Sequence, residues 1–310
     1  MTLTQLKYII AVDDHRHFAT AAAKCYVTQP TLSMQIHKFE QELNILIFDR
    51  SKHPVIPTQK GELVIEQARL ILKESDRLKK IIVEGKDEFN GTFRIGVIPS
   101  LAPYLLPFFI KEFTEQYPNL KIVVEEALTN KIIKKLHHDQ LDVGIIAKQI
   151  QQKNIYQISL FREPFVTFAS SNHPIAGLDK IDIHQLKDEN IWLLRDGNYL
   201  RDQILDLCKK ADIKINNHAI QIKSDNLETL KNLVENNMGL TLLPFLAARK
   251  IDSSRNVVIR PFKAPVPERS IHLVYGRLYL KKKVITAFQN AITSNIPSEL
   301  MTTENGILIA

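Results

Sequence analysis

The stretch from Phe18 to Phe39 constrains this chain most, because it predicts two short helices joined by a tight break. Its alanine-rich first part is a strong helix former, slim enough to pack closely against a neighbouring helix. Thr28 is suited to cap the second helix, and Pro30 falls in its first turn, where a missing N–H costs nothing. Apolar residues then recur at helical spacing and should face a core: Leu32, Ile36, Phe39 and Leu43.

The opposite side of the second predicted helix is polar and basic. Such side chains can meet phosphates and base edges when a helix enters a DNA groove. The candidate DNA-contacting residues here are Thr28, Gln29, Pro30, Thr31, Ser33, Gln35 and Lys38. Taken singly, each is better explained as part of a solvated face, and only the whole arrangement favours DNA binding.

Two further elements are predicted around the helix pair. Before it, Thr4 is expected to cap an earlier helix. After it, Ile45–Phe48 and Val55–Ile56 read as the strands of a β-ribbon that flank a turn. Arg50 and Lys52 lie near the ribbon tip, where positive charge favours phosphate contact. A solvated basic turn explains Lys52 about as well, and Arg50 less well.

Taken in order along the chain, these motifs resemble the winged helix-turn-helix of LysR-type transcriptional regulators. The residues that carry the resemblance are Ala22-Ala23, Gln29-Pro30-Thr31-Leu32-Ser33, Gln35-Ile36, Glu40, Leu43, Phe48-Asp49-Arg50, Thr58 and Gly61. The resemblance implies a sequence-specific regulator that works as a dimer of dimers on an inverted repeat in double-stranded DNA. Each recognition helix would enter a major groove. RNA polymerase is a further partner that the resemblance allows.

From Thr58 to about Glu88 the chain predicts one long helix with a single apolar stripe. The stripe consists of Val64, Ala68, Ile71, Leu78 and Ile82. One helix cannot cover such a stripe by itself, so pairing with a second copy of the chain is the economical solution. The resemblance likewise implies a linker helix through which LysR-type proteins dimerise.

After Gly91 the pattern changes to alternating strands and helices, which predicts α/β layers with mostly parallel sheets. The expected strands are Thr92–Val97, Lys121–Glu126, Val143–Ala147 and Gly239–Pro244, and the expected helices are Tyr104–Gln116, Asn130–His138, Tyr199–Lys210 and Asn226–Asn236. The run from Ser224 to Leu230 and the later GLTLLP resemble the effector domain of the same family. That resemblance implies a fold like that of periplasmic binding proteins, with two lobes around a cleft.

The expected domain boundaries follow from these patterns. Residues 1–58 would form the winged helix-turn-helix, 59–89 the linker helix and 90–310 the effector domain. Within the effector domain, 90–162 and 267–310 would form one lobe and 163–266 the other. The chain would cross between lobes near Phe161–Pro164 and Pro265–Pro267.

Within the family, the chain is most similar to the peroxide-sensing members. The likeness rests on Asp14–Phe18, Cys25, Ile98-Pro99, Pro103–Pro107, Asp196-Gly197 and Leu200–Gln203. In those proteins a His-Cys pair precedes the Leu-Arg-Asp-Gln run, and a second cysteine follows nine residues after the first. Here Asn198-Tyr199 stand in place of the pair, and Cys208 occupies the resolving position.

This replacement matters because a thiolate attacks peroxide and then condenses with a second thiol, which a phenol cannot do. The resemblance therefore implies that the thiol–disulfide switch is lost. Redox sensing by Cys208 alone stays open as an alternative. A lone cysteine beside Ile204, Leu205 and Leu207 is, however, more often a buried small hydrophobe.

The resemblance also maps an effector pocket onto this sequence. Its residues would be Ser100, Thr129, Asn198, Tyr199, Arg201, Asp202, Cys208 and Arg269. Ser100 and Thr129 follow predicted strands, and ligands of α/β folds gather at the carboxyl ends of strands, near helix N-termini. A small polar or anionic effector is thus an alternative to peroxide, while simple N-capping explains the two hydroxyls about equally well. No metal and no cofactor are expected.

Composition limits the broader class of protein. The 310 residues are 45% hydrophobic and 24% charged, as in ordinary globular domains. The net charge of +7 is compatible with a polyanionic partner, but residues 1–90 hold 13 basic and 12 acidic side chains, so charge does not locate the DNA site. No apolar run approaches the roughly 18–20 residues that cross a bilayer, and no secretion signal is recognisable. Two cysteines exclude a disulfide framework, so the cytoplasm is the expected compartment.

Two other functions compete with gene regulation. A thiol peroxidase would need a reactive cysteine beside a base in a cleft, and Tyr199 removes the candidate. No GxSxG, HExxH, P-loop or dinucleotide motif is present, so an enzyme is not expected. A solute-binding protein would share the two-lobed fold, but the winged helix and the missing export signal weigh against it.

Overall fold

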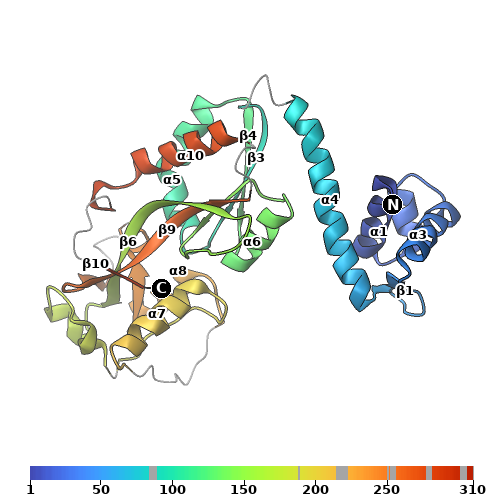
Figure 1. Cartoon of the computed structure of the whole chain (residues 1–310). Helices are drawn as coiled ribbons and strands as arrows, with labels where there is room; N and C mark the ends of the chain where they lie inside the picture. The colour runs from blue at the N-terminus through green and yellow to red at the C-terminus, as the bar shows by residue number, and fades with distance from the viewer. Residues whose placement is uncertain are drawn as a thin grey trace. The chain divides into compact units, whose positions relative to one another are not determined.

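The computed structural model describes residues 1–83, 89–187, 189–213, 223–249, 251, 256–276, 281–300 and 306–309. The chain divides into two compact units, Met1–Asp87 and Glu88–Ala310 (Figure 1). Among the described residues, no helix is both long enough and apolar enough to cross a membrane.

The first unit begins with three helices: α1 (Leu3–His15), α2 (Phe18–Lys24) and α3 (Gln29–Leu43). The cap of α1 is Thr2, so the prediction of Thr4 is wrong. Thr2 Oγ1 accepts from the Gln5 backbone N–H at 3.2 Å, and Gln5 Oε1 accepts from the Thr2 N–H at 2.8 Å. This reciprocal capping box satisfies two helix-end donors at once, which explains why α1 begins two residues earlier.

The predicted core of the helix pair is confirmed except at its end. Leu32, Ile36 and Phe39 of α3 are buried in a core that they share with α1 and α2. Leu43 is 40% exposed, so its predicted burial is wrong. It is the last residue of α3, because the chain enters the left-handed conformation at Asn44 and leaves the helix axis there.

A short antiparallel ribbon follows α3. It pairs β1 (Phe48–Asp49) with β2 (Ile56–Pro57), so the predicted ribbon is confirmed in place but is shorter than expected. Ile47, expected in the first strand, instead lies before β1 with its side chain buried in the core of the unit. The hydrophobic run therefore serves packing more than strand pairing.

The last element of the first unit is α4 (Gln59–Val83). Its first half packs on the core through one apolar face: Val64, Ile65, Ala68, Ile71 and Leu72. Ala68 is buried in that core and Val64 and Ile71 are partly buried against it, so much of the stripe that was expected to face a second copy packs within the unit instead. The side chains of Leu78 and Ile82 lie outside the described residues. Gly61 lets the start of α4 pack closely against the backbone of Ile47. A side chain would not fit there, because an added Cβ would lie 2.0 Å from the Ile47 carbonyl oxygen.

The second unit contains an eight-stranded mixed sheet with the order β4-β3-β5-β9-β6-β7, where β10 also pairs with β9 and β8 with β6. The strands are β3 (Gly91–Val97), β4 (Leu120–Glu126), β5 (Val143–Ile146), β6 (Tyr156–Ser170), β7 (Leu240–Pro244), β8 (Val257–Pro261), β9 (Val266–Tyr275) and β10 (Gly306–Leu308). The helices are α5 (Ala102–Gln116), α6 (Thr129–His137), α7 (Tyr199–Lys210), α8 (Leu227–Glu235), α9 (Phe245–Ala248) and α10 (Lys282–Asn295). The predicted strands and helices of this region are all present, with shifts of one or two residues at their ends.

The expectation of mostly parallel sheets is wrong. Among the named strands of the described residues, β3 with β4, β3 with β5 and β10 with β9 pair in parallel, whereas β9 runs antiparallel to β5 and β6, and β6 runs antiparallel to β7 and β8. Strand β9 lies between β5 and β6 and runs opposite to both, so its insertion makes the centre of the sheet antiparallel.

Two hydrophobic cores divide the second unit into lobes, as expected for a two-lobed fold. In the first lobe, the Phe288 ring of α10 lies 5.4 Å from Phe93 and 5.3 Å from Phe109, centroid to centroid. The second lobe has its own core, which includes Trp192 and residues of α7 and α8. Strand β6 contributes Phe161 to the first core and Phe165 to the second, so it runs through both lobes.

Candidate functional site

The candidate DNA-binding surface is the exposed side of α3. Thr28, Gln29, Pro30 and Lys38 are exposed, and Thr31, Ser33 and Gln35 are partly exposed. Sequence reasoning missed two exposed neighbours, Met34 and His37, which share a shallow hollow with Pro30, Ser33, Lys38 and Gln41. Their spacing of three residues from each other, and of three or four from predicted contacts, could have identified them.

Several of these side chains are already held in place. The hydroxyls of Thr28 and Thr31 are 2.8 Å apart, and Thr28 Oγ1 also accepts from the Thr31 N–H at 3.4 Å. Buried Gln5 of α1 donates to Gln35 Oε1 at 3.4 Å. The start and middle of the exposed face are therefore fixed by the helix cap and by α1, which orients the polar groups before any partner arrives.

Arg50 does not extend freely from the ribbon. Its Nη1 donates to Ser33 Oγ at 3.1 Å and its Nη2 to Glu40 Oε2 at 3.0 Å, while its guanidinium lies 5.0 Å from the Phe18 ring centroid. These contacts tie the ribbon to α3 and partly neutralise the arginine charge. Lys52, in contrast, is exposed at the turn.

Glu40 is the buried group that organises this corner. One carboxylate oxygen accepts from the backbone N–H groups of Ile47 and Phe48 at 2.8 and 3.3 Å, and the other accepts from Arg50. A buried carboxylate is stable only when donors satisfy it, and here three do so. The sequence analysis named Glu40 only as one of the residues that carry the family resemblance. Its position beside Phe39, on the apolar face of the helix, could have indicated a buried carboxylate.

In the second unit, Ser100 and Arg269 come together as predicted, with Glu163 as an unpredicted third member. Fully buried Arg269 donates through Nε to Glu163 Oε2 at 2.9 Å and through Nη1 to Ser100 Oγ at 2.9 Å. Glu163 on β6 and Arg269 on β9 are paired directly in the strand register. Glu163 also accepts from the Leu246 N–H at 2.8 Å. A glutamate inside an apolar strand was the sequence signal for this ion pair.

Simple N-capping does not explain the two predicted pocket hydroxyls. The cap positions of α5 and α6 are Leu101 and Leu128, and neither makes a side-chain cap. The Ser100 hydroxyl accepts from Arg269 instead. The Thr129 hydroxyl is buried and makes no hydrogen bond within the part of the chain that the structure describes.

The remaining predicted pocket residues lie along α7. Asn198 caps this helix by accepting from the Leu200 N–H at 3.1 Å, and it donates to Asp225 Oδ1 at 3.0 Å. Arg201 bonds the Leu194 carbonyl at 3.2 Å and Asp196 at 2.9 Å, both in its own lobe. These partners do not join Arg201 to the Ser100–Arg269 cluster. Asp202 is exposed.

Tyr199 is half-buried in the first turn of α7. Its ring centroid lies 4.9 Å from the Nζ of Lys148, a residue that follows β5 in the first lobe. Burial, followed by the charges of Asp206 and Asp202, raises the pKa of the phenol. The hydroxyl therefore stays protonated near neutral pH.

Cys208 lies within the core of the second lobe, and burial raises the pKa of its thiol to about 11. It shares α7 with Tyr199, nine residues away. At 1.5 Å per residue, the two positions are about 14 Å apart along the helix axis. No cluster of three metal-binding side chains occurs among the described residues.

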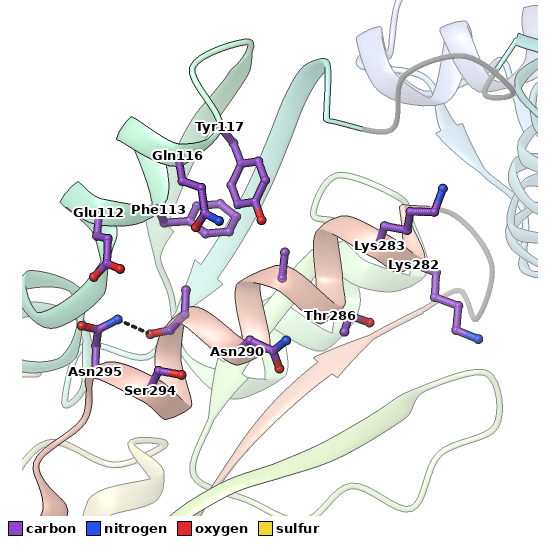
Figure 2. Close-up of a pocket in the computed structure, with 12 residues that line it drawn as sticks. Glu112, Phe113, Gln116, Tyr117, Lys282, Lys283, Thr286, Asn290, Ser294 and Asn295 are labelled. Carbon is purple, nitrogen blue, oxygen red and sulfur yellow. Dashed lines mark hydrogen bonds between the residues drawn. The ribbon is translucent and has the colours of Figure 1, made fainter.

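A separate open groove lies in the first lobe between α5 and α10. Figure 2 shows its polar lining, with Glu112 and Gln116 on one side and Thr286, Asn290 and Ser294 on the other. Asn295 turns back to donate to the Ala291 carbonyl at 3.0 Å. None of the residues predicted for the effector pocket lines this groove.

Comparison with known proteins connects both sites to one family. Residues 3–62 match the bacterial regulatory helix-turn-helix protein, lysR family, and residues 86–296 match the LysR substrate binding domain. The hydrogen peroxide-inducible genes activator of Haemophilus influenzae is 36% identical over 89% of this chain and 90% of that protein. The DNA-binding transcriptional dual regulator OxyR of Escherichia coli is 36% identical over 89% of each chain.

Solved structures agree with the sequence comparison. A full-length OxyR variant from Pseudomonas aeruginosa matches with a TM-score of 0.75 and 32% identity, covering 94% of each chain. A hydrogen-peroxide-bound OxyR mutant from Corynebacterium glutamicum matches with a TM-score of 0.64 and 29% identity, covering 95% of this chain and 92% of that one. The likeness therefore spans both units.

Proposed function

This chain belongs to the LysR family of transcriptional regulators and is OxyR-like, and we propose that α3 reads its promoter while the second unit receives its signal. Regulators of this family bind DNA and form oligomers. The observation that carries the proposal is the exposed polar side of α3, which Thr28, Gln5 and Arg50 hold in one conformation. Such a regulator works where the DNA is, in the cytoplasm.

The proposed DNA contacts are the exposed and partly exposed side chains of α3, with Lys52 as a phosphate contact from the ribbon. Each recognition helix enters a major groove of an inverted repeat, in a dimer of dimers. Arg50 acts mainly by positioning the ribbon against α3, since Ser33 and Glu40 already use its donors. RNA polymerase is a further proposed partner at the promoter.

Self-association needs an apolar surface that the first unit does not use itself. Leu63 and Leu70 of α4 are 67% and 42% exposed, and they are seven residues apart, so they share one face of the helix. We assign the pairing face to these two residues in place of Val64, Ala68 and Ile71. Sedimentation of Leu63→Glu at micromolar concentration should show a smaller particle than wild type; an unchanged particle would contradict this assignment.

DNA reading is tested with the Gln35→Ala variant on the protein's own promoter. We expect weaker discrimination at one base position, by about 1–3 kcal/mol, because a bidentate amide contact would be lost. Binding should also weaken steeply with salt. The matched control is Gln67→Ala, which removes an exposed glutamine from α4. A footprint that is insensitive to salt and unchanged in Gln35→Ala would overturn the proposal.

The signal differs from that of a thiol-switch regulator. Tyr199 cannot form a sulfenic acid, and buried Cys208 carries almost no thiolate at neutral pH because its pKa is raised to about 11. A small polar molecule is the alternative to peroxide as the effector. The Thr129 hydroxyl could bind it, because this hydroxyl is buried without a hydrogen bond in the described structure. Arg269 does not favour an anion, since Glu163 already neutralises it.

A further inference from the structure

The two lobes of the second unit are joined by a small polar cluster. Tyr104 projects from α5 of the first lobe, and Glu228 and Lys231 project from α8 of the second. The Tyr104 hydroxyl donates to Glu228 Oε1 at 2.8 Å and accepts from Lys231 Nζ at 3.4 Å. Lys231 also donates to Glu228 at 2.7 Å. We call these three residues the latch.

Tyr104 connects the lobes by packing as well as by hydrogen bonds. Its side chain contacts the hydrophobic cores of both lobes. Burial, followed by the Glu228 carboxylate, raises the pKa of its phenol, so the hydroxyl remains a donor at any physiological pH. The contact therefore persists across the pH range in which the protein works.

Lys231 makes the cluster sensitive to lobe movement. Its side chain is only 4% exposed, and its Nζ lies 4.8 Å from the Tyr104 ring centroid. A buried ammonium is costly unless partners replace its water. Two of those partners, the ring and the hydroxyl, belong to the other lobe. Separation of the lobes would remove both at once but leave the Glu228 partner, and water would then solvate the charge.

The latch is close in sequence to the proposed effector cluster, which includes the turn before α5. Ser100 is four residues before Tyr104, and its hydroxyl accepts from Arg269. Movement of the start of α5 would thus reach both Arg269 and the latch. A second tyrosine–lysine contact also bridges the lobes. Here the tyrosine, Tyr199, comes from the second lobe and the lysine, Lys148, from the first.

We propose that Tyr104, Glu228 and Lys231 form a conformational latch that holds the two lobes together and opens when the effector domain changes state. The latch rests on contacts within the second unit and does not depend on which effector binds. Its failure would therefore leave the proposed promoter recognition standing. Conversely, a chain that failed to bind DNA would not disprove the latch.

The test is hydrogen exchange of the full-length protein, comparing wild type with Tyr104→Phe and Lys231→Met. Tyr104→Phe keeps the ring and removes the hydroxyl, and Lys231→Met keeps the apolar stem and removes the charge. We expect each to speed exchange of amides in α5 and α8 by about tenfold, the effect of losing a hydrogen bond to a charged group. The control is Tyr156→Phe, which removes a hydroxyl from an exposed site in the same unit.

The double variant separates a latch from two independent structural roles. If the hydroxyl and the ammonium act together, adding Lys231→Met to Tyr104→Phe should speed exchange by less than the product of the single effects. Unchanged exchange in both single variants, or fully independent effects in the double variant, would overturn the latch. Should Lys231→Met fail to fold, Tyr104→Phe alone decides, because its ring still fills the space between the cores.

Discussion

The exposed side of α3 and the predicted effector pocket of the second unit differ in how they are built. All predicted DNA contacts of α3 come from one helix and its cap, so one periodicity places them together. The predicted pocket residues come from the turn before α5, from α6, from α7 and its cap, and from β9, and among the described residues only Ser100 and Arg269 of this set are joined by a side-chain hydrogen bond. A surface made by one helix follows from local sequence, whereas a site made by several elements depends on their packing.

The largest expected effect is the loss of stability when the buried ion pair between Glu163 and Arg269 is broken. Arg269→Met leaves the Glu163 carboxylate buried and without its charge partner, because both side chains are fully buried. We expect the free energy of unfolding to fall by about 3–5 kcal/mol. Urea unfolding followed by the fluorescence of Trp192, the single tryptophan, measures this directly in the second unit.

The double variant Glu163→Leu with Arg269→Met is the control for that measurement. Removing both charges should restore most of the lost stability, because no isolated buried charge remains. A double variant as unstable as Arg269→Met would mean that shape, and not charge, is what the pair provides.

A smaller effect is expected at the corresponding corner of the first unit. Glu40→Gln weakens hydrogen bonds to the Ile47 and Phe48 amides and to Arg50, which is partly exposed. We expect a loss of about 1.5–3 kcal/mol, seen as faster hydrogen exchange at those two amides. If Arg50 is a positioning residue, base preference at the promoter should also weaken. A steeper salt dependence with unchanged preference would instead identify Arg50 as a phosphate contact.

Tyr199→Cys places a thiol at the start of α7, nine residues before Cys208. We expect this variant, unlike wild type, to form a disulfide with Cys208 on peroxide treatment and to change its small-angle scattering. Because the positions are about 14 Å apart along α7, and a disulfide needs Cα atoms within about 7 Å, that helix must unwind. The ring loss itself should cost about 1–2 kcal/mol at this half-buried site.

Tyr199→Ser serves as the control for that variant, since it removes the ring without adding a thiol. Intact mass before and after peroxide identifies the disulfide. A peroxide-dependent change in wild-type scattering would contradict the proposed loss of the switch.

The smallest effect is the pH dependence that Cys208 contributes. Burial raises the pKa of its thiol from 9.0 to about 11, so the thiol of the unfolded chain ionises first as pH rises. Stability is therefore full below pH 9 and falls between pH 9 and 11, by roughly 1 kcal/mol at pH 10. Cys208→Ala should lose less stability than wild type between pH 8 and 10 in urea unfolding. Equal losses in the two proteins would mean that the thiol does not titrate on unfolding.

Sequence reasoning succeeded where a property is local. Thr28 as a cap, the burial of Leu32, Ile36 and Phe39, and the ends of α7 all follow from spacing along one helix. It failed where distant segments compete for the same surface. The α4 stripe was expected to face a second copy, yet Val64, Ala68 and Ile71 pack on the core of their own unit. Leu63 and Leu70 were left exposed instead, and no local pattern distinguishes the two faces.

The family, the order of the elements and the polar face of α3 follow from the sequence alone, because helix periodicity, caps and ordered motifs act over a few residues. Which polar groups meet across strands and lobes depends on tertiary packing, as in Glu163 with Arg269 and Lys231 with Tyr104. Those partners are separated by more than a hundred residues, and the energy of a buried charge depends on the neighbours that packing brings to it.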